Sequence, residues 1–261
     1  MHKIFFHIDD FGRSKIISEK ILNTIKFGST NSVSVMMGFV NKKIHKKILK
    51  TKIKTKLHLN LTESPKIGTG KNKKKFDSLN FIKLIFLNQK EKKILKKEIN
   101  EQINDYTNIY GKNNLRVDGH QHIHIIPWIH DYLVNNSKYN IKEIRYPNEK
   151  IWIFKYKILF KFKFYRNLLA LLVVKFLILF IKKKKYSPEF FGLLYTGLYN
   201  QKILQKNFKY VNKKKHTEIL IHGGHTNKSE KKFFKKDFFK HYSSNENKTQ
   251  YKLALKKNLL K

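Results

Sequence analysis

Three histidines occur at alternate positions in one short segment. Residues 118–124 read Asp-Gly-His-Gln-His-Ile-His, so His120, His122 and His124 share one face if the segment is extended. Neutral imidazoles are natural ligands of a divalent metal ion, whereas protonated ones would repel one another. The pattern therefore favours a metal site, and a histidine cluster without a specific ligand is the alternative.

Two adjacent aspartates follow the first apolar run of the chain. Asp9 and Asp10 come directly after residues 3–8, and Gly12 follows them. In parallel α/β folds, ligands and catalytic groups gather at the carboxyl ends of strands. Successive strand side chains point to opposite faces, so both carboxylates serve one site only if the chain turns there, as Gly12 permits. An acidic pair that caps a helix is the alternative.

Two further histidines lie at the ends of apolar runs. His58 begins the alternating segment His-Leu-Asn-Leu-Thr, whose polar face is costly unless it lines a cavity or binds something. His222 follows the apolar residues 219–221 and precedes Gly223 and Gly224, which leave room for a ligand or a tight turn. Each histidine alone is compatible with a structural role in the core.

The elements that must position these residues alternate along the chain. Strand-like and helix-like runs take turns, which predicts an α/β fold with a largely parallel sheet. The expected strands are residues 3–8, 33–37, 57–62, 116–126, 143–146 and 218–222, and the expected helices are residues 14–27, 42–50 and 90–110. Ser14 is the expected cap of the first helix and Gly28 its stop.

An apolar and basic segment at residues 151–185 interrupts this alternation. Its apolar core, residues 168–181, contains one lysine and is shorter than the roughly 20 residues that a spanning helix needs. Two interpretations stay open: a helix that packs its apolar face inward, or a helix in the membrane interface whose lysines reach lipid phosphates.

Composition and charge limit the remaining classes. The 261 residues contain no cysteine, which excludes disulfides and cysteine-bound zinc, and 41% are hydrophobic, which excludes a disordered chain. The formal charge of +39 comes almost wholly from lysine spread along the chain, whereas specific phosphate recognition favours arginine. We therefore expect no specific nucleic-acid partner, although attraction to anionic membrane surfaces follows from the charge.

The ordered motifs resemble those of the YdjC-like carbohydrate deacetylases, the family of diacetylchitobiose deacetylase and the hopanoid-biosynthesis deacetylases. The matching segments, between about residues 3 and 225, are Asp9-Asp10-Phe11-Gly12, His58-Leu59-Asn60-Leu61-Thr62, residues 118–124 with Pro127, Arg145-Tyr146-Pro147, and Phe190-Phe191-Gly192-Leu193 with Thr196-Gly197. Two departures stand beside them. His7-Ile8 replaces the usual Asn-Ala, and His222-Gly223 replaces the usual His-Pro.

The resemblance implies a single-domain, (β/α) barrel-like fold, similar to a TIM barrel with irregularities. It implies that Asp10, His58 and His120 hold one divalent metal ion, magnesium or zinc before manganese or cobalt, and that Asp9 is the general base. His222 is the candidate general acid. The substrate-binding candidates are His122, His124 and Arg145.

The expected activity is metal-dependent removal of an acetyl group from an N-acetylated amino sugar, an oligosaccharide or a lipid-linked glycan. The alternatives are another metal-dependent hydrolase such as a phosphoesterase, which would need arginine or a second metal for the phosphate, or a lysine-rich nucleic-acid-binding protein. No signal peptide is apparent, since residues 4–8 run directly into Asp9 and Asp10. We expect a cytoplasmic protein in peripheral contact with membrane, and consider a homodimer. The polar tail, residues 227–261, carries no motif and is expected to form a terminal helix or to fray.

Overall fold

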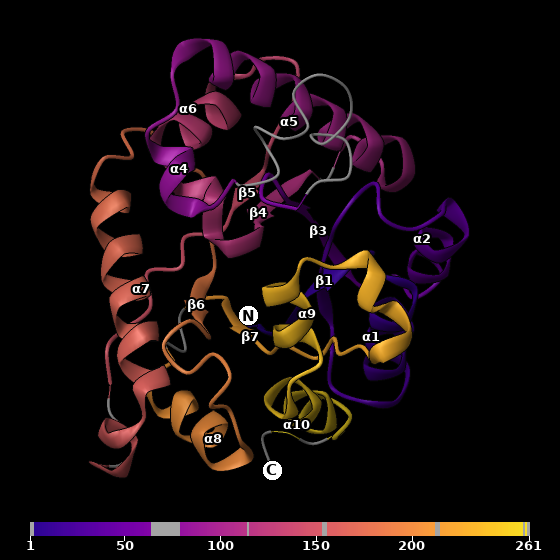
Figure 1. The fold of residues 1–261 in the computed structure, drawn as a ribbon, viewed down its shortest axis with the longest axis vertical. Helices are drawn as coiled ribbons and strands as arrows, with labels where there is room; N and C mark the ends of the chain where they lie inside the picture. The colour runs from indigo at the N-terminus through magenta and orange to yellow at the C-terminus, as the bar shows by residue number, and fades with distance from the viewer. Residues whose placement is uncertain are drawn as a thin grey trace.

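Seven parallel strands form one curved sheet at the centre of the protein (Figure 1). The computed structural model describes residues 3–63, 79–113, 115–152, 156–211, 215–257 and 259. In the order β5-β4-β3-β2-β1-β7-β6, the strands are Glu143–Ile144, Arg116–Gly119, Lys54–Leu59, Ser32–Val35, Ile4–Phe11, Thr217–Leu220 and Glu189–Phe191. Strands that are adjacent in the sheet are also consecutive along the chain, except for β1 and β7. A barrel has this order, because its first and last strands meet.

The sheet curls into a half-barrel, and its edge strand β5 forms one bridge, from Glu143 to Tyr186, which precedes the other edge strand β6. Helices flank it, as Figure 1 shows. The α-helices are α1 Lys15–Phe27, α2 Lys42–Leu49, α4 Phe81–Ile85, α5 Gln89–Tyr110, α6 Pro127–Asn135, α7 Phe162–Leu179, α8 Gln201–Tyr210, α9 Lys236–Tyr242 and α10 Asn245–Ala254, and the 3-10 turns are η2 His120–Ile125, η3 Tyr156–Phe160 and η4 Lys228–Phe233. The α/β class and the barrel-like curvature are confirmed.

Local sequence explains the ends of the first helix. The Ser14 side chain accepts a hydrogen bond from the Ile17 backbone N–H, and the Gly28 N–H closes the helix by donating to the Thr24 carbonyl. Ile17 and Ile21 are fully buried against the sheet side of the core. The predicted start and end of this helix are confirmed, while the three-residue strand β6 was not among the predicted strands.

The histidine segment is not extended, contrary to the sequence prediction. Strand β4 ends at Gly119, and the chain continues into the 3-10 turn η2. Gln121 and His122 have φ angles of 54° and 59°, in the left-handed region. The alternate spacing of the three histidines therefore does not place them on one face.

The apolar segment and the tail both form helices. Within 151–185, α7 buries Phe164, Leu171 and Val174. No helix among the described residues is long and apolar enough to cross a membrane. The tail forms η4, α9 and α10, and Tyr242, Leu253 and Ala254 are buried in the core. It is thus an ordered part of the fold over residues 228–254.

Charged side chains fill the interior of the half-barrel. Lys56 is fully buried and pairs with Glu143 at 2.7 Å and with Glu218. Arg145 is also fully buried and pairs through Nε with Glu218 Oε1 at 2.6 Å. A buried charge is tolerated only when it is paired, so these contacts couple β3, β7 and the end of β5.

Removing the Lys56 charge should therefore destabilise the fold strongly. We expect Lys56→Met to lower the free energy of unfolding by about 3–5 kcal/mol, because two buried carboxylates each lose one of their cations. Urea denaturation at neutral pH measures this loss. The control is Lys163→Met, which breaks the partly exposed pair with Glu246 and should cost no more than about 1 kcal/mol. Equal losses in the two variants would contradict a structural role for the buried network.

Candidate active site

A cavity of about 800 Å³ opens at the carboxyl ends of the strands. Its polar lining brings together residues that are far apart in the sequence, namely Asp9, Asp10, His58, His120, His122 and His222. Helix α7 supplies an apolar wall, and α9 supplies Phe238 and His241. The sequence candidates therefore converge in one place, which is the position where parallel α/β folds carry their ligands.

A local distortion of β1 brings both aspartates to this cavity. The pairing of β1 with β2 shifts between Ile8 and Phe11, and Asp10 has a φ angle of 73°. A non-glycine residue in the left-handed region is strained, and such strain collects at functional sites. Gly12 follows with φ 90°, and a Cβ there would stand 2.4 Å from the Met36 carbonyl oxygen. The turn that the acidic pair requires thus begins at Asp10 itself and uses Gly12.

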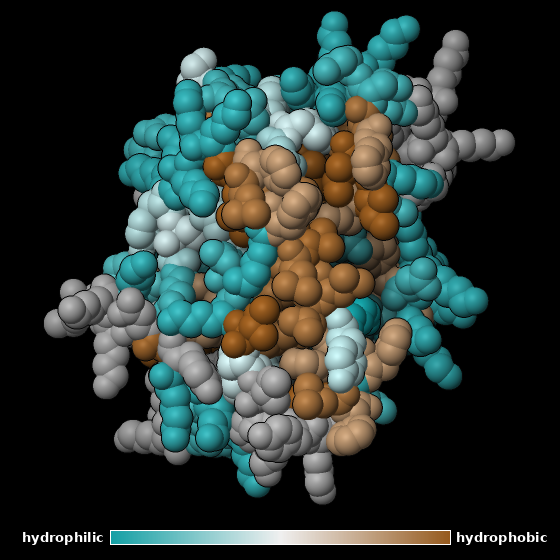
Figure 2. All heavy atoms as spheres, turned by 90° about the vertical axis from the view of Figure 1, so that its left-hand side faces the viewer, coloured by the Kyte–Doolittle hydropathy of each residue, from teal (hydrophilic) through white to brown (hydrophobic). Residues whose placement is uncertain are grey.

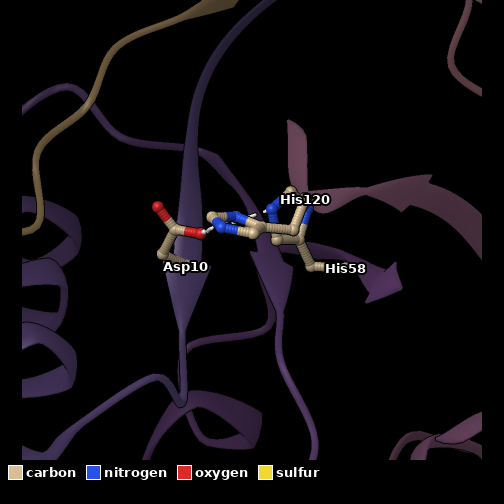
Figure 3. A group of neighbouring side chains, drawn as sticks. All are labelled: Asp10, His58 and His120. Carbon is tan, nitrogen blue, oxygen red and sulfur yellow. Dashed lines mark ion pairs between the residues drawn. The ribbon is translucent and has the colours of Figure 1, made fainter. Parts of the chain in front are cut away.

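Three of the side chains point at one another (Figure 3). Asp10 Oδ1 lies 3.3 Å from His58 Nε2 and 3.3 Å from His120 Nδ1. This oxygen is buried, and among the described residues no hydrogen bond of ordinary geometry reaches it. One carboxylate and two imidazoles converging in this way form a donor set that suits a divalent cation.

Carboxylates behind both histidines fix the orientation of the rings. His58 Nδ1 lies 2.6 Å from Asp118 Oδ1, so its N–H donates there and leaves Nε2 facing Asp10. His120 Nε2 lies 3.4 Å from Glu63 Oε2. A carboxylate on the far nitrogen of a metal-binding histidine sets the tautomer and raises the basicity of the ligating nitrogen. Once the facing nitrogens are deprotonated, as metal binding requires, both imidazoles present a lone pair toward Asp10.

Two other groups in the described part of the chain bring three potential ligands together, but their donor atoms are engaged. In the group of Asp9, His58 and Asp118, Arg145 holds Asp9 by both oxygens. In the group of His7, Asp118 and Glu218, the two His7 nitrogens lie 2.8 and 2.7 Å from the hydroxyls of Ser32 and Ser34. The cluster of Asp10, His58 and His120 is the one that combines available donors with the cavity.

The electrostatics of the cluster favour binding of a cation. Burial of His58 opposes its protonation, but the carboxylates of Asp9 and Asp118 overcome this and raise its pKa to about 10. Burial likewise opposes ionisation of Asp10, yet contacts with His120 and His58 hold its pKa well below the usual range. The site thus has a strong negative potential that a proton or a metal ion can relieve.

Asp9 lies beside the candidate ligand cluster, 4.0 Å from His58 Nε2, but its main partner is Arg145. Arg145 Nη1 and Nη2 donate to its two oxygens at 3.1 and 3.0 Å, and His7 Nε2 lies 3.0 Å from Oδ1. Burial favours the protonated acid, but Arg145 overcomes this and lowers the pKa of Asp9 well below its usual value. Asp9 is therefore an ionised carboxylate at the cavity. His7, which stands where the family usually has asparagine, contacts it directly.

The substrate-contact roles suggested for Arg145 and His124 do not agree with the structure. The Arg145 side chain has no exposed surface and also pairs with Asp118 Oδ2 at 2.6 Å. His124 is likewise fully buried, and its Nε2 lies 2.7 Å from the Arg145 carbonyl oxygen. Both residues lie beneath the site. Both residues belong to motifs that resemble those of the family. Such a resemblance indicates that a residue belongs to the site, but it does not say whether the residue contacts substrate or supports Asp9.

The remaining candidates do line the cavity. Burial and the neighbouring Arg145 charge lower the pKa of His122 to about 3, so its ring is neutral. Burial also lowers the pKa of His222, whose Nδ1 is buried and forms no hydrogen bond with the described residues. His222 is thus a neutral imidazole at the cavity with one uncommitted nitrogen.

Sequence analysis missed two contributions to the site. His241 on α9 stacks edge-on against His222 at 5.7 Å, and burial lowers its pKa to about 4. Glu63 supports His120 and accepts a hydrogen bond of 2.7 Å from Arg13 Nη2. Neither residue belongs to a sequence pattern that indicates a functional role, although Glu63 directly follows the motif of residues 58–62.

Comparisons with known proteins found a matching family model and a similar fold. A family model described as YdjC-like protein matches residues 3–258, and so extends past the last sequence motif into the C-terminal helices. A solved structure from Enterococcus faecalis V583, named as a candidate cellobiose-phosphate cleavage protein, is similar with a TM-score of 0.59 and 14% identity, over 98% of this chain and 96% of that chain. A search of curated proteins gave no match.

The supporting carboxylate of His58 provides a test of the metal site. We expect Asp118→Asn to weaken zinc binding by about 10–100-fold, because the His58 ring loses its orientation and basicity. His58→Ala should abolish stoichiometric binding, whereas His122→Ala should bind as the wild type does. Competition with a chromophoric chelator measures the affinities, and circular dichroism checks folding. Zinc binding that is unchanged in His58→Ala would contradict the assignment.

Proposed function

The chain belongs to the YdjC-like protein family, and from that premise we propose that it is a metal-dependent hydrolase that removes the acetyl group from an N-acetylated amino sugar. The observation that carries the proposal is the pairing, in one cavity, of a ligand cluster with a separate ionised carboxylate. Asp10, His58 and His120 are the ligands, and Asp9 is the carboxylate. The products are a free amine and acetate.

The roles of the two aspartates follow from their partners. A divalent ion held by the cluster would supply polarisation of the amide carbonyl and a lowered pKa for water. Asp9 accepts the proton of the attacking water, and because Arg145 keeps it ionised it is ready to do so over a wide pH range. The same pairing makes Asp9 a weak base, so acidification of the water is essential to this chemistry.

The departing amine must gain a proton, and His222 is the proposed donor. His222 lines the cavity, and its buried Nδ1 has no hydrogen-bond partner among the described residues. The neutral imidazole can take up the proton that Asp9 has accepted, and the imidazolium so formed can donate that proton to the leaving nitrogen. His241 lies beside it and is the second imidazole available for this transfer.

A phosphoesterase remains the competing activity. Phosphate hydrolysis calls for uncommitted positive charge at the site, and Arg145 is already bound to three carboxylates. Arg166 and Lys235 line the cavity and can favour an anionic sugar. Phosphorylated sugars therefore belong in the substrate panel, and measurement of both acetate and phosphate separates the two activities.

Loss of the general base should leave metal binding intact. We expect Asp9→Asn to lower kcat for acetate release by about 10²–10⁴-fold while zinc still binds, because Asp9 is not a ligand. Acetate release from N-acetylated oligosaccharides and lipid-linked sugars, with added divalent metals, measures the activity. Metal-dependent release of phosphate without acetate would overturn the proposal, as would full activity in Asp9→Asn.

A leaving-group test isolates the proposed acid. We expect His222→Ala to lower kcat by about 10²-fold or more on an alkyl amide. The loss should shrink on an acetanilide whose aryl amine leaves with little protonation. A loss of equal size on both substrates would show that His222 acts in some other way than as an acid.

A further inference from the structure

The outward face of α7 is apolar along its length. Residues spaced three and four apart, as neighbours on one face of a helix are, point away from the core. The α7 strip, as we define it, consists of Phe162, Tyr165, Leu169, Leu172, Phe176 and Leu179. Phe162 is 85% exposed and Leu179 is 78% exposed, and the opposite face of the helix is buried in the protein. A helix at the surface of a water-soluble domain normally carries polar residues on its outer face.

Basic residues border the strip, and acidic ones are absent from its part of the sequence. Residues 151–188 contain ten lysines and arginines and no aspartate or glutamate. Three of these residues are exposed. Lys161 and Arg166 lie near the amino end of α7, and Lys182 lies beyond its carboxyl end. An apolar strip bordered by cations is complementary to an anionic lipid bilayer, in which a negatively charged headgroup layer covers an apolar interior.

The strip continues into the wall of the active-site cavity. Leu169 is 64% exposed and also lines the cavity, as does Val173 beside it. Across the cavity, Ile82 of α4 is 66% exposed and belongs to the same lining. Figure 2, which faces the side of the molecule where α7 lies, shows apolar residues gathered in a large patch. Patches of this kind mark interaction sites.

We propose that the α7 strip docks the protein on the surface of an anionic lipid bilayer. The apolar side chains enter the interface between headgroups and acyl chains, and the bordering lysines and arginine contact lipid phosphates. The protein lies on the membrane and does not span it, in keeping with the absence of a spanning helix among the described residues.

Charge favours a lipid surface over a second copy of the chain as the occupant. The same three-and-four spacing could form a seam between two helices, but residues beside such a seam, including Arg166 and Lys175, would then face their own copies. Like charges across a seam repel, and two chains each with a formal charge of +39 repel at longer range. Anionic lipids reverse the sign of both effects.

Docking through α7 brings the mouth of the cavity to the level of the lipid headgroups. A lipid-linked N-acetylated sugar can then present its sugar to the metal-binding cluster while its chains stay in the bilayer. This substrate class rests on the proposed function, whereas docking itself does not. Membrane binding should accordingly be the same for Asp9→Asn and the wild type, so failure of one idea is distinguishable from failure of the other.

Vesicle flotation tests the docking surface. The probes are vesicles of phosphatidylcholine with or without about one third phosphatidylglycerol, at about 0.15 M salt. We expect the wild type to float with the anionic vesicles, and Leu172→Glu/Phe176→Glu to show at least about a tenfold lower partition coefficient. Neither residue lines the cavity.

The matched control places the same two charges elsewhere. Phe27→Glu/Leu49→Glu changes residues that are 50% and 42% exposed at the ends of α1 and α2, which lie across the molecule from α7 in Figure 1. It should float as the wild type does, and circular dichroism establishes folding of both variants. The proposal is overturned if the wild type does not float, or if the two double variants float equally. It is also overturned if sedimentation without lipid reveals a dimer that only the α7 variant loses.

Discussion

The buried guanidinium of Arg145 is the interaction on which the site depends. It contacts Asp9 at the cavity, Asp118 behind His58, and Glu218 in the interior of the half-barrel. A fully buried arginine is stable only when every part of its fork is paired, so the positions of these carboxylates are fixed together. Through Asp118 the same side chain orients His58, and so the general base and the metal-binding cluster share one support.

This arrangement gives two adjacent aspartates different chemistry. Asp9 is committed to Arg145, whereas Asp10 turns towards His58 and His120 because its backbone is left-handed. Asp9, Asp118 and Glu218 pair with Arg145, whereas Asp10 forms no ion pair with a lysine or arginine of the described residues. Asp10 lines the cavity, which is where a divalent ion would balance its charge. Sheet, charge network and proposed chemistry are thus consequences of one electrostatic requirement.

Sequence patterns located the parts of the site but not all of their geometry. Strand and helix periodicity identified most of the parallel sheet, and the family resemblance brought Asp10, His58 and His120 into one proposal. Alternation failed at residues 120–124, because a turn with two left-handed residues cannot be read from side-chain spacing. The roles of Arg145 and His124 were misjudged because burial depends on the closed sheet. His241 was missed because the tail that carries it has no local motif.

The most direct test of the account is X-ray absorption spectroscopy of the protein loaded with one equivalent of zinc. The structure leads us to expect scattering from two imidazole rings at about 2.0–2.1 Å together with oxygen ligands, and no change when Asp9 is replaced by asparagine. A first coordination sphere with no imidazole, or with only one, would contradict the assignment of Asp10, His58 and His120. A spectrum that changes in Asp9→Asn would contradict the separation of base from ligand.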